Sequence, residues 1–291
     1  MLSMIIPSDK DYLLQKTIDS LLENAEGEIE VIPILDGHEQ PIKKDSRVKP
    51  IYFNVNKGTR AAINAGLAVS KGDYIAKIDS HCIVAESFDK ILLENIEKNW
   101  LVVPRRYSLH EKTGTRHEER PICDYHFLNF PVESKYGYGM FAQDLLSKSH
   151  HFRRVDMIDD LMTFQASCWL ANRKYFMKHV GFLDDSLDTY GPFGGEYIEI
   201  GFKYWLGGGA VKINKKTWYA HLCKRSYHYK QGIYTKRYKK NTNKNRDWSS
   251  KHWINNEEPN MIHKFEWLIE KFWPIRTWKE NWQEIWNNYK L

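Results

Sequence analysis

The first hundred residues alternate short apolar runs with amphipathic stretches, and this alternation restricts the chain to a small set of folds. The amphipathic stretches 11–24 and 59–69 carry their apolar residues at helical spacing. The runs of strand length lie at 3–6, 30–35, 51–55 and 74–78. Strands separated by helices predict an α/β fold with a doubly wound, mostly parallel central sheet flanked by helices.

Two prolines fall at or inside these runs. Pro7 follows 3–6 and is expected to end that strand. Pro33 lies within 30–35. Because proline cannot donate a ladder hydrogen bond, Pro33 predicts an edge strand or a bulge.

Polar clusters follow three of the predicted strands, at 7–9, 36–38 and 79–81. In open α/β sheets, ligands bind beyond the carboxyl ends of the strands, so these clusters are the first candidates for a site. The glycine fingerprint of dinucleotide-binding folds is absent from the first turn, which argues against a dinucleotide cofactor.

The second half of the chain is less regular, and residues 105–155 carry no clear periodicity. A strand followed by a helix is expected within 161–180, a glycine-rich loop at 191–195 and a helix at 196–205. A strand is expected at 210–220, just before His221. Beyond Pro259, tryptophans alternate with charged residues and predict amphipathic helices that pack on the body.

Asp79 and His81 are separated by one residue, so an extended chain would place both side chains on the same side. A carboxylate with an imidazole suits Mn²⁺ or a similar ion that keeps positions open for phosphate oxygens. Ordinary turn chemistry is the commoner explanation of an aspartate after a strand. His221 is equally ambiguous, since a histidine at a strand end is commonly a packed side chain unless the fold brings it to the first pair.

Glu196 follows two glycines at the start of a predicted helix. Glycines allow a loop to pass close to a ligand, and a carboxylate there can accept hydrogen bonds from sugar hydroxyls. An acidic residue that complements the helix dipole is the alternative interpretation.

Residues 224–251 contain ten lysines and arginines against the single acid Asp247, with tyrosines and tryptophans between them. Such a stretch can bind a diphosphate or a nucleic-acid backbone by stacking and phosphate contact. A solvated charged face is the alternative. The chain as a whole carries a net charge of only +6.

Two blocks together resemble a known family. The first runs through 57–62 and 70–73 to the string Asp-Ser-His-Cys at 79–82. The second spans 193–200 and continues to His221. Over 3–253 the chain resembles metal-dependent nucleotide-sugar glycosyltransferases of the GT-A fold and family 2 type. In detail it resembles the catalytic domain of polypeptide N-acetylgalactosaminyltransferases, without that branch's lectin domain and membrane anchor.

The resemblance implies that Asp79, His81 and His221 hold one ion, Mn²⁺ or Mg²⁺. It implies a catalytic group of Glu196, Lys224 and Glu199, with Lys224 beside the diphosphate. It further implies that Asp36 and Arg60 lie near the uridine and Ser80 near the ribose, within a donor-binding group of Pro7, Asp36, Arg60, Asp79, Ser80, Phe193 and Tyr229.

Three departures from the family pattern bear on the chemistry. Phe193 replaces a tryptophan, and 167–168 is Ser-Cys where the branch has two glycines. Tyr197 stands where inverting relatives carry a carboxylate base. A tyrosine with a pKa of about 10 is a poor base at neutral pH. This favours a retaining transfer in which the leaving phosphate takes the proton, with Glu199 or Asp188 as alternative bases.

The sequence therefore predicts one GT-A domain with a helical, aromatic-rich C-terminal extension. The expected parts are a nucleotide-sugar-binding half at 1–105, a metal-completing and acceptor-binding half at 106–230, and the extension at 231–291. The expected reaction transfers a sugar from a UDP-sugar to a hydroxyl of a glycan, a protein or a modified nucleic acid. The alternatives are transfer to hydroxylated DNA bases, a non-catalytic nucleic-acid-binding protein on a degenerate transferase fold, and nucleotidyl transfer.

The chain shows no secretory signal pattern and no apolar run of the roughly 18 residues that a membrane span needs. Its four cysteines are widely spaced, which indicates reduced thiols rather than a disulfide framework. These features predict a cytoplasmic protein without a membrane span.

Overall fold

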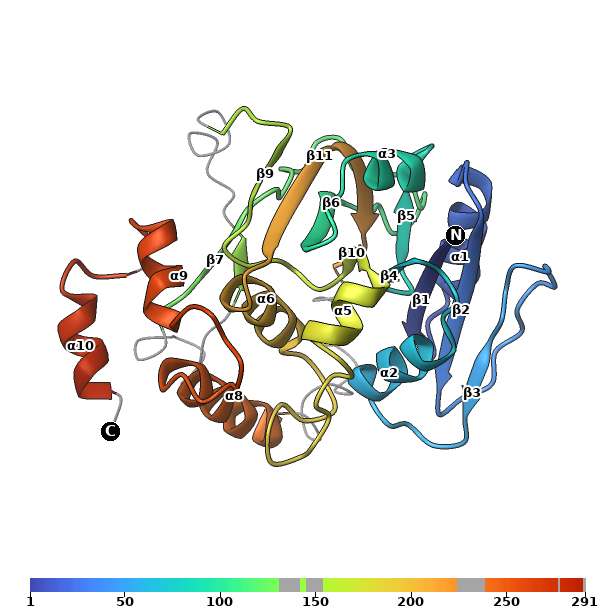
Figure 1. The fold of residues 1–291 in the computed structure, drawn as a ribbon. Coiled ribbons are helices and arrows are strands. Elements are labelled where there is room, and N and C mark those ends of the chain that lie inside the picture. Colours follow the sequence, from blue (N-terminus) through green and yellow to red (C-terminus); the bar gives the residue numbers. More distant parts are fainter. Residues whose placement is uncertain (131–141, 145–153, 224–238, 277, 290–291) are drawn as a thin grey trace.

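The computed structural model of the chain describes residues 1–130, 142–144, 154–223, 239–276 and 278–289 (Figure 1). Side chains are described throughout these ranges except at 142–144, 239–243 and 289. A nine-stranded sheet forms the centre of the molecule, with strand order β3-β2-β1-β4-β10-β6-β11-β5 and with β9 paired to β11.

The first part of the sheet is wholly parallel, as the sequence predicts. Its strands are β1 (Leu2–Ser8), β2 (Ile29–Asp36), β3 (Ile51–Phe53) and β4 (Tyr74–Ile78). Along β1, Ile5 joins a cluster with helix α2 (Thr59–Val69), whereas Met4 and Ile6 join a cluster with helix α1 (Leu14–Asn24). Strands β1, β2 and β4 are thus buried on both faces, which explains their continuous apolar runs.

The two prolines behave differently from the expectation. Pro7 does not end the first strand, because it remains paired with Ile34 inside β1 and β2. Pro33 lies within β2, which is flanked by β1 and β3 and pairs with β1 without a bulge. On its other side β2 pairs at Val31 and again from Ile34, so Pro33 falls where this ladder is interrupted. The missing N–H therefore costs no ladder bond there.

The second part of the sheet mixes strand directions. Strand β10 (Cys168–Asn172) runs antiparallel to both β4 and β6 (Trp100–Ser108), whereas β11 (Ala210–His221) is parallel to β6. The remaining strands are β5 (Cys82–Val84) at the edge, β9 (Ile158–Asp160), and the separate pair β7 (His126–Leu128) and β8 (Ala142–Asp144). Strands from both predicted halves share one sheet, while the boundaries of those halves stay predictions.

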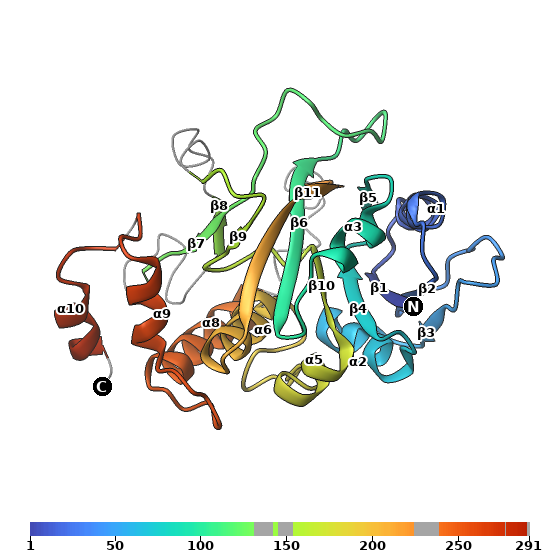
Figure 2. The same ribbon diagram turned by 45° about the horizontal axis from the view of Figure 1, so that its top comes forward.

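Helices cover the sheet, and further helices lie beyond one end of it (Figure 2). Those between the strands are α3 (Phe88–Glu94), α5 (Arg173–His179) and α6 (Glu196–Leu206). At the end away from α1 and β3 lie α8 (Lys239–Ile254), α9 (Phe265–Phe272) and α10 (Trp282–Tyr289) (Figure 1). The predicted α/β class with a mostly parallel core and a helical, aromatic-rich extension is confirmed.

Aromatic packing joins this extension to the main domain. Trp286 is 1% exposed and stacks on Phe265, with ring centroids 5.3 Å apart. The indole N–H of Trp278 donates to the carbonyl oxygen of Leu128 at 2.8 Å. These residues belong to the same buried cluster as the sheet, so the extension is part of the core.

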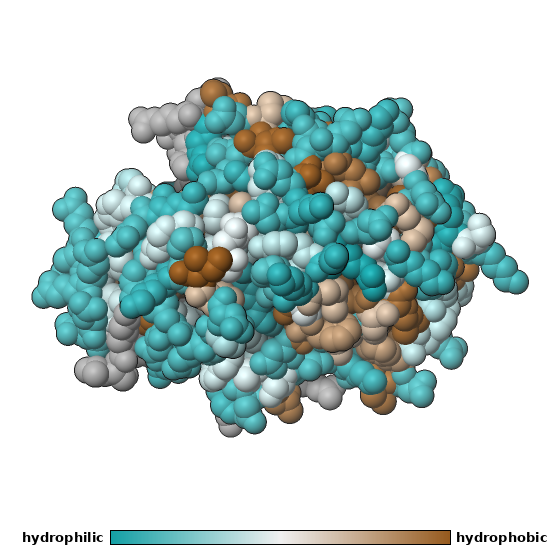
Figure 3. Space-filling view, viewed as in Figure 1, coloured by the Kyte–Doolittle hydropathy of each residue, from teal (hydrophilic) through white to brown (hydrophobic). Residues whose placement is uncertain are grey.

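Hydrophilic side chains cover most of the face shown in Figure 3, with apolar ones scattered between them. Among the described residues, no helix has the length and apolar character needed to cross a membrane. Cys82, Cys123 and Cys168 are buried thiols, and Cys223 is exposed.

The packing of the extension predicts that Trp286→Ala lowers the free energy of unfolding by about 3–5 kcal/mol, because it empties a buried aromatic site. Urea unfolding followed by circular dichroism measures this loss. Ile262→Ala is the matched control, since Ile262 is 71% exposed and its truncation should change stability by about 0.5 kcal/mol or less. Equal losses for the two variants would show that the extension is not part of the core.

Candidate active site

The pairing of β5 with β11 brings together residues that lie 140 positions apart in the sequence. Strand β4 ends at Ile78, and Asp79, Ser80 and His81 form the connection into β5. Strand β5 is antiparallel to β11, with Cys82 directly opposite His221. The backbone N–H of Leu222 also donates to the carbonyl oxygen of His81 at 3.1 Å. This register places His221 beside the connection.

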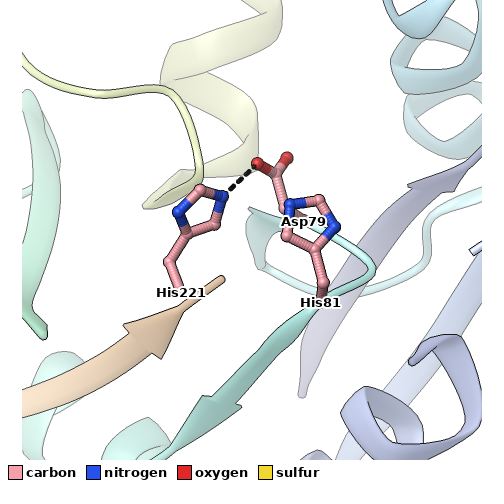
Figure 4. A group of neighbouring side chains, drawn as sticks. All are labelled: Asp79, His81 and His221. Atoms are coloured by element: carbon pink, nitrogen blue, oxygen red, sulfur yellow. Dashed lines mark ion pairs between the residues drawn. The ribbon is translucent and has the colours of Figure 1, made fainter. Parts of the chain in front are cut away.

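The side chains of Asp79, His81 and His221 converge at this point (Figure 4). One potential ligand atom from each lies within 4.8 Å of the other two. Asp79 Oδ2 is 3.2 Å from His221 Nε2, and the two imidazole centroids are 4.8 Å apart. The structure therefore brings together the three residues that the sequence singled out.

The environment of His221 fits a metal ligand. Its side chain is 8% exposed, and both ring nitrogens are buried without a hydrogen bond among the described residues. The Asp79–His221 contact is within ion-pair distance but lacks hydrogen-bond geometry. An unsatisfied buried polar atom costs about 1–3 kcal/mol. A divalent cation bound by two imidazoles and a carboxylate would remove this cost, and Mn²⁺ accepts such mixed ligands.

Lys77, the last residue but one of β4, is a component of the site that the sequence analysis missed. Its ammonium group donates to Asp79 Oδ1 and to the carbonyl oxygen of Ala166, both at 2.6 Å, and lies 3.4 Å from Glu196 Oε2. Its side chain is 3% exposed. The signal was present, since a lysine inside an apolar strand is buried only when anions surround it.

This lysine sets the electrostatics of the site. Burial opposes the ionisation of Asp79, but the charge of Lys77, followed by the contact with His221, holds the pKa of Asp79 well below its usual range. Burial likewise disfavours the charged form of Lys77. The negative charges of Asp79 and Glu196 outweigh this effect and raise the pKa of Lys77. Asp79 is therefore a carboxylate across the physiological pH range.

Glu196 begins α6 and points its carboxylate into the same region. Gly194 and Gly195, which precede it, have φ of 81° and 71°, conformations that favour glycine. Glu196 is 4% exposed, and its Oε2 atom is buried without a hydrogen bond among the described residues. Through Lys77, this carboxylate is linked to Asp79.

Arg60 and Glu199 form a buried ion pair behind this loop. The guanidinium of Arg60 donates through Nη2 to Glu199, through Nε to the carbonyl oxygen of Asp184 at 2.7 Å, and through Nη1 to that of Gly194 at 2.9 Å. Glu199 also accepts a bond from Lys203 at 2.9 Å. Burial lowers the pKa of Arg60. These contacts fix the loop that carries Glu196.

The loop before α6 is held on two sides. Gly58, just before α2, has a φ of 96°. A Cβ at this position would lie 2.4 Å from the carbonyl oxygen of Pro192. The backbone at the start of α2 therefore packs directly against the backbone of the loop. From the other side, the Asn245 amide on α8 donates to the carbonyl oxygens of Leu187 and Thr189. Helix α8 thus supports the loop that leads to Glu196.

The predicted donor-binding residues lie in different environments. Both carboxylate oxygens of Asp36 accept backbone N–H groups, from Lys57 at 2.6 Å and Gly58 at 2.8 Å. Burial raises the pKa of Asp36, although these bonds oppose the shift. Ser80 is buried, and its hydroxyl donates to Asp11 at 2.6 Å.

Five other predicted positions complete the comparison. Pro7 is half-buried in β1, and Phe193 is 39% exposed in the loop before α6. Asp188, an alternative base, is exposed and pairs with Lys244 at 2.9 Å. Lys224 and Tyr229 lie outside the described residues, so their roles stay predictions.

The family model described as glycosyl transferase family 2 matches residues 6–181, more than half of the chain. The chain therefore belongs to this family. A probable N-acetylgalactosaminyltransferase 9 of Caenorhabditis elegans is 28% identical over 77% of this chain and 37% of its own length. The uncharacterized glycosyltransferase EpsJ of Bacillus subtilis is 30% identical over 35% of this chain and 32% of its own.

A solved structure shares the fold. The crystal structure of GalNAc-T7 with UDP, GalNAc and Mn²⁺ matches with a TM-score of 0.55 and 18% identity, covering 76% of this chain and 43% of that chain. The match supports the GT-A architecture. The chain spans little more than a third of the length of the first curated relative.

The buried ion pair yields a stability prediction. Arg60→Met removes the main partner of the Glu199 carboxylate and leaves that charge buried and incompletely paired. It should lower the free energy of unfolding by about 3–5 kcal/mol. The double variant Arg60→Met/Glu199→Met should recover part of this loss. Chemical denaturation of the three proteins measures both effects.

An exposed ion pair supplies the control. Lys43→Met breaks the contact with Asp19, but the Lys43 side chain is 71% exposed, so the expected loss is about 1 kcal/mol or less. A loss for Arg60→Met no larger than that of Lys43→Met would contradict a structural role for the buried pair.

Proposed function

We propose that this family 2 glycosyltransferase uses Mn²⁺ or Mg²⁺ to transfer a sugar from a UDP-sugar to an acceptor hydroxyl. The observation that carries this proposal is the convergence of Asp79, His81 and His221, in which both buried nitrogens of His221 lack a hydrogen bond among the described residues. The UDP and Mn²⁺ named with the GalNAc-T7 structure support the same choice of donor and ion.

The three residues would hold the ion on the carboxyl side of β4, next to the end of β11. When bound, the ion neutralises charge on the diphosphate leaving group and orients it. Lys77 keeps Asp79 ionised and leaves Asp79 Oδ2 facing His221. Lys224 is proposed to add a positive charge beside the diphosphate oxygens.

Glu196 is proposed to bind the donor sugar. Its buried Oε2 atom has no hydrogen bond within the described parts of the chain, and sugar hydroxyls are donors that would satisfy it. The ammonium group of Lys77, 3.4 Å away, attracts this carboxylate and holds it near the proposed metal residues. Asp36, Arg60, Ser80, Pro7, Phe193 and Tyr229 complete the proposed donor-binding group. The contacts of Arg60 support a role in positioning the Glu196 loop.

We further propose that the anomeric configuration is retained. An inverting reaction needs a free carboxylate that deprotonates the acceptor. Glu199 is 1% exposed on its side chain and already accepts from Arg60 and Lys203, which supports a positioning role more than a basic one. In a retaining reaction the acceptor proton passes to the leaving phosphate oxygen as the new glycosidic bond forms.

The acceptor is proposed to be a hydroxyl of a glycan or protein, as the names of the N-acetylgalactosaminyltransferase relatives suggest. Transfer to hydroxylated DNA bases stays a prediction that rests on the basic stretch 224–251, most of which lies outside the residues with described side chains. The salt dependence of duplex binding separates these acceptors, because phosphate contacts give a steep slope. The cytoplasmic location likewise stays a prediction.

Removal of the metal residues provides the test of function. In a screen of UDP-sugars for UDP release with Mn²⁺, Asp79→Asn and His221→Gln should each lower the rate by roughly 100- to 1000-fold, since charge stabilisation of the leaving group is lost. His179→Gln is the control, because His179 stacks on Tyr175 in α5 outside the site. Unchanged rates in the two site variants would refute the proposal.

The stereochemical proposal has its own test. With the active UDP-sugar, proton NMR of the first product formed should show the same anomeric configuration as the donor. A product of opposite configuration would contradict retention and would favour one of the alternative bases, Glu199 or Asp188.

A further inference from the structure

We infer that Asp11 is a positioning residue that fixes the imidazole of His81 so that its Nε2 atom faces the metal position. The inference rests on the proposed metal site. Asp11 precedes α1 and is 2% exposed. Its Oδ2 atom lies 2.7 Å from His81 Nδ1. Figure 4 shows one ring nitrogen of His81 directed toward Asp79 and His221 and the other turned away.

The chemistry of the contact fixes the tautomer of His81. An ionised carboxylate only accepts hydrogen bonds, so the nitrogen that faces it must carry a proton. With the proton on Nδ1, the neutral ring keeps its lone pair on Nε2, where a cation can bind it. Metal-binding histidines commonly donate their second N–H to a carboxylate in this way, which fixes the ring and strengthens the ligand.

The carboxylate of Asp11 is itself held in place. Its Oδ1 atom accepts the backbone N–H of Leu13 at 3.0 Å, and its Oδ2 atom also accepts the hydroxyl of Ser80 at 2.6 Å. The side-chain amide of Gln40 donates to the Asp11 carbonyl oxygen at 2.9 Å. The start of α1 is therefore coupled to the connection that carries two of the three metal residues.

Asp11→Asn tests this role with almost no change of shape. Because the Leu13 N–H requires an oxygen at Oδ1, the amide nitrogen would face His81 and donate to Nδ1. The ring proton would then move to Nε2 and block the lone pair. We expect the Mn²⁺ dissociation constant, measured by electron paramagnetic resonance titration, to rise about 10- to 100-fold.

Nitrogen-15 NMR of the metal-free protein reads the tautomer directly, independently of activity. The wild type should show His81 protonated on Nδ1 and Asp11→Asn should show it protonated on Nε2, with His81→Gln identifying the signals. Asp11→Glu restores a carboxylate and should retain the Nδ1–H form. The wild-type spectrum alone tests the inference if Asp11→Asn does not fold.

Asp9→Asn is the matched control, because it removes the same charge from an exposed position two residues earlier. It should leave the His81 tautomer and the Mn²⁺ dissociation constant unchanged. A wild-type protein with His81 protonated on Nε2, or an Asp11→Asn protein with unchanged Mn²⁺ affinity, would overturn the inference. A wild-type protein that binds neither Mn²⁺ nor Mg²⁺ would overturn the proposed function instead, whatever the tautomer.

Discussion

The antiparallel register between β5 and β11 is the constraint on which the rest of the site depends. It sets Cys82 opposite His221, and thereby places the last residue of β11 beside the connection that follows β4. A shift of one residue would turn every side chain of β11 to the opposite face. The twelve residues of β11, mostly buried and paired with β6, β5 and β9, hold this register.

Several charged side chains are buried near the pairing of β5 with β11, and they are paired with one another. Lys77 lies between Asp79 and Glu196, and Arg60 lies between Glu199 and the carbonyl groups of the loop before α6. Buried ions are costly unless they are paired, so each charge fixes the position of its partners. One lysine consequently orients both carboxylates, that of Glu196, which we propose binds the donor sugar, and that of Asp79, which we propose binds the metal. The structure thus links the two sequence blocks, which lie more than a hundred residues apart, through the side chains of Lys77 and Arg60.

Much of the architecture could be predicted from the sequence, because apolar periodicity reflects burial. The helix at 59–69 coincides with α2, and the helix expected at 196–205 is α6 with one further residue. The prolines were harder, since whether a strand lies at an edge depends on its neighbours. Pro33 is tolerated in an inner strand only because the adjacent ladder is interrupted there, a feature of tertiary pairing that local sequence does not contain.

The candidate site could be predicted only in part, because the roles of several of its residues depend on contacts in the folded chain. Asp79, His81 and His221 could be named from a resemblance, but their spacing alone left each one open to an ordinary structural explanation. Lys77 and Asp11 were missed because their importance comes from contacts: one is a lysine inside an apolar strand, and the other a single acid before a helix. Arg60 and Glu199 were expected at the donor and in catalysis, and the structure shows how they are engaged with each other.

Crystals of the protein grown with UDP and Mn²⁺ offer the most direct measurement, through an anomalous difference map recorded at the manganese absorption edge. One strong peak is expected among the side chains of Asp79, His81 and His221, within bonding distance of all three and of the diphosphate. A map with no peak there, or with manganese bound elsewhere while UDP occupies the carboxyl ends of the strands, would contradict the proposed metal site.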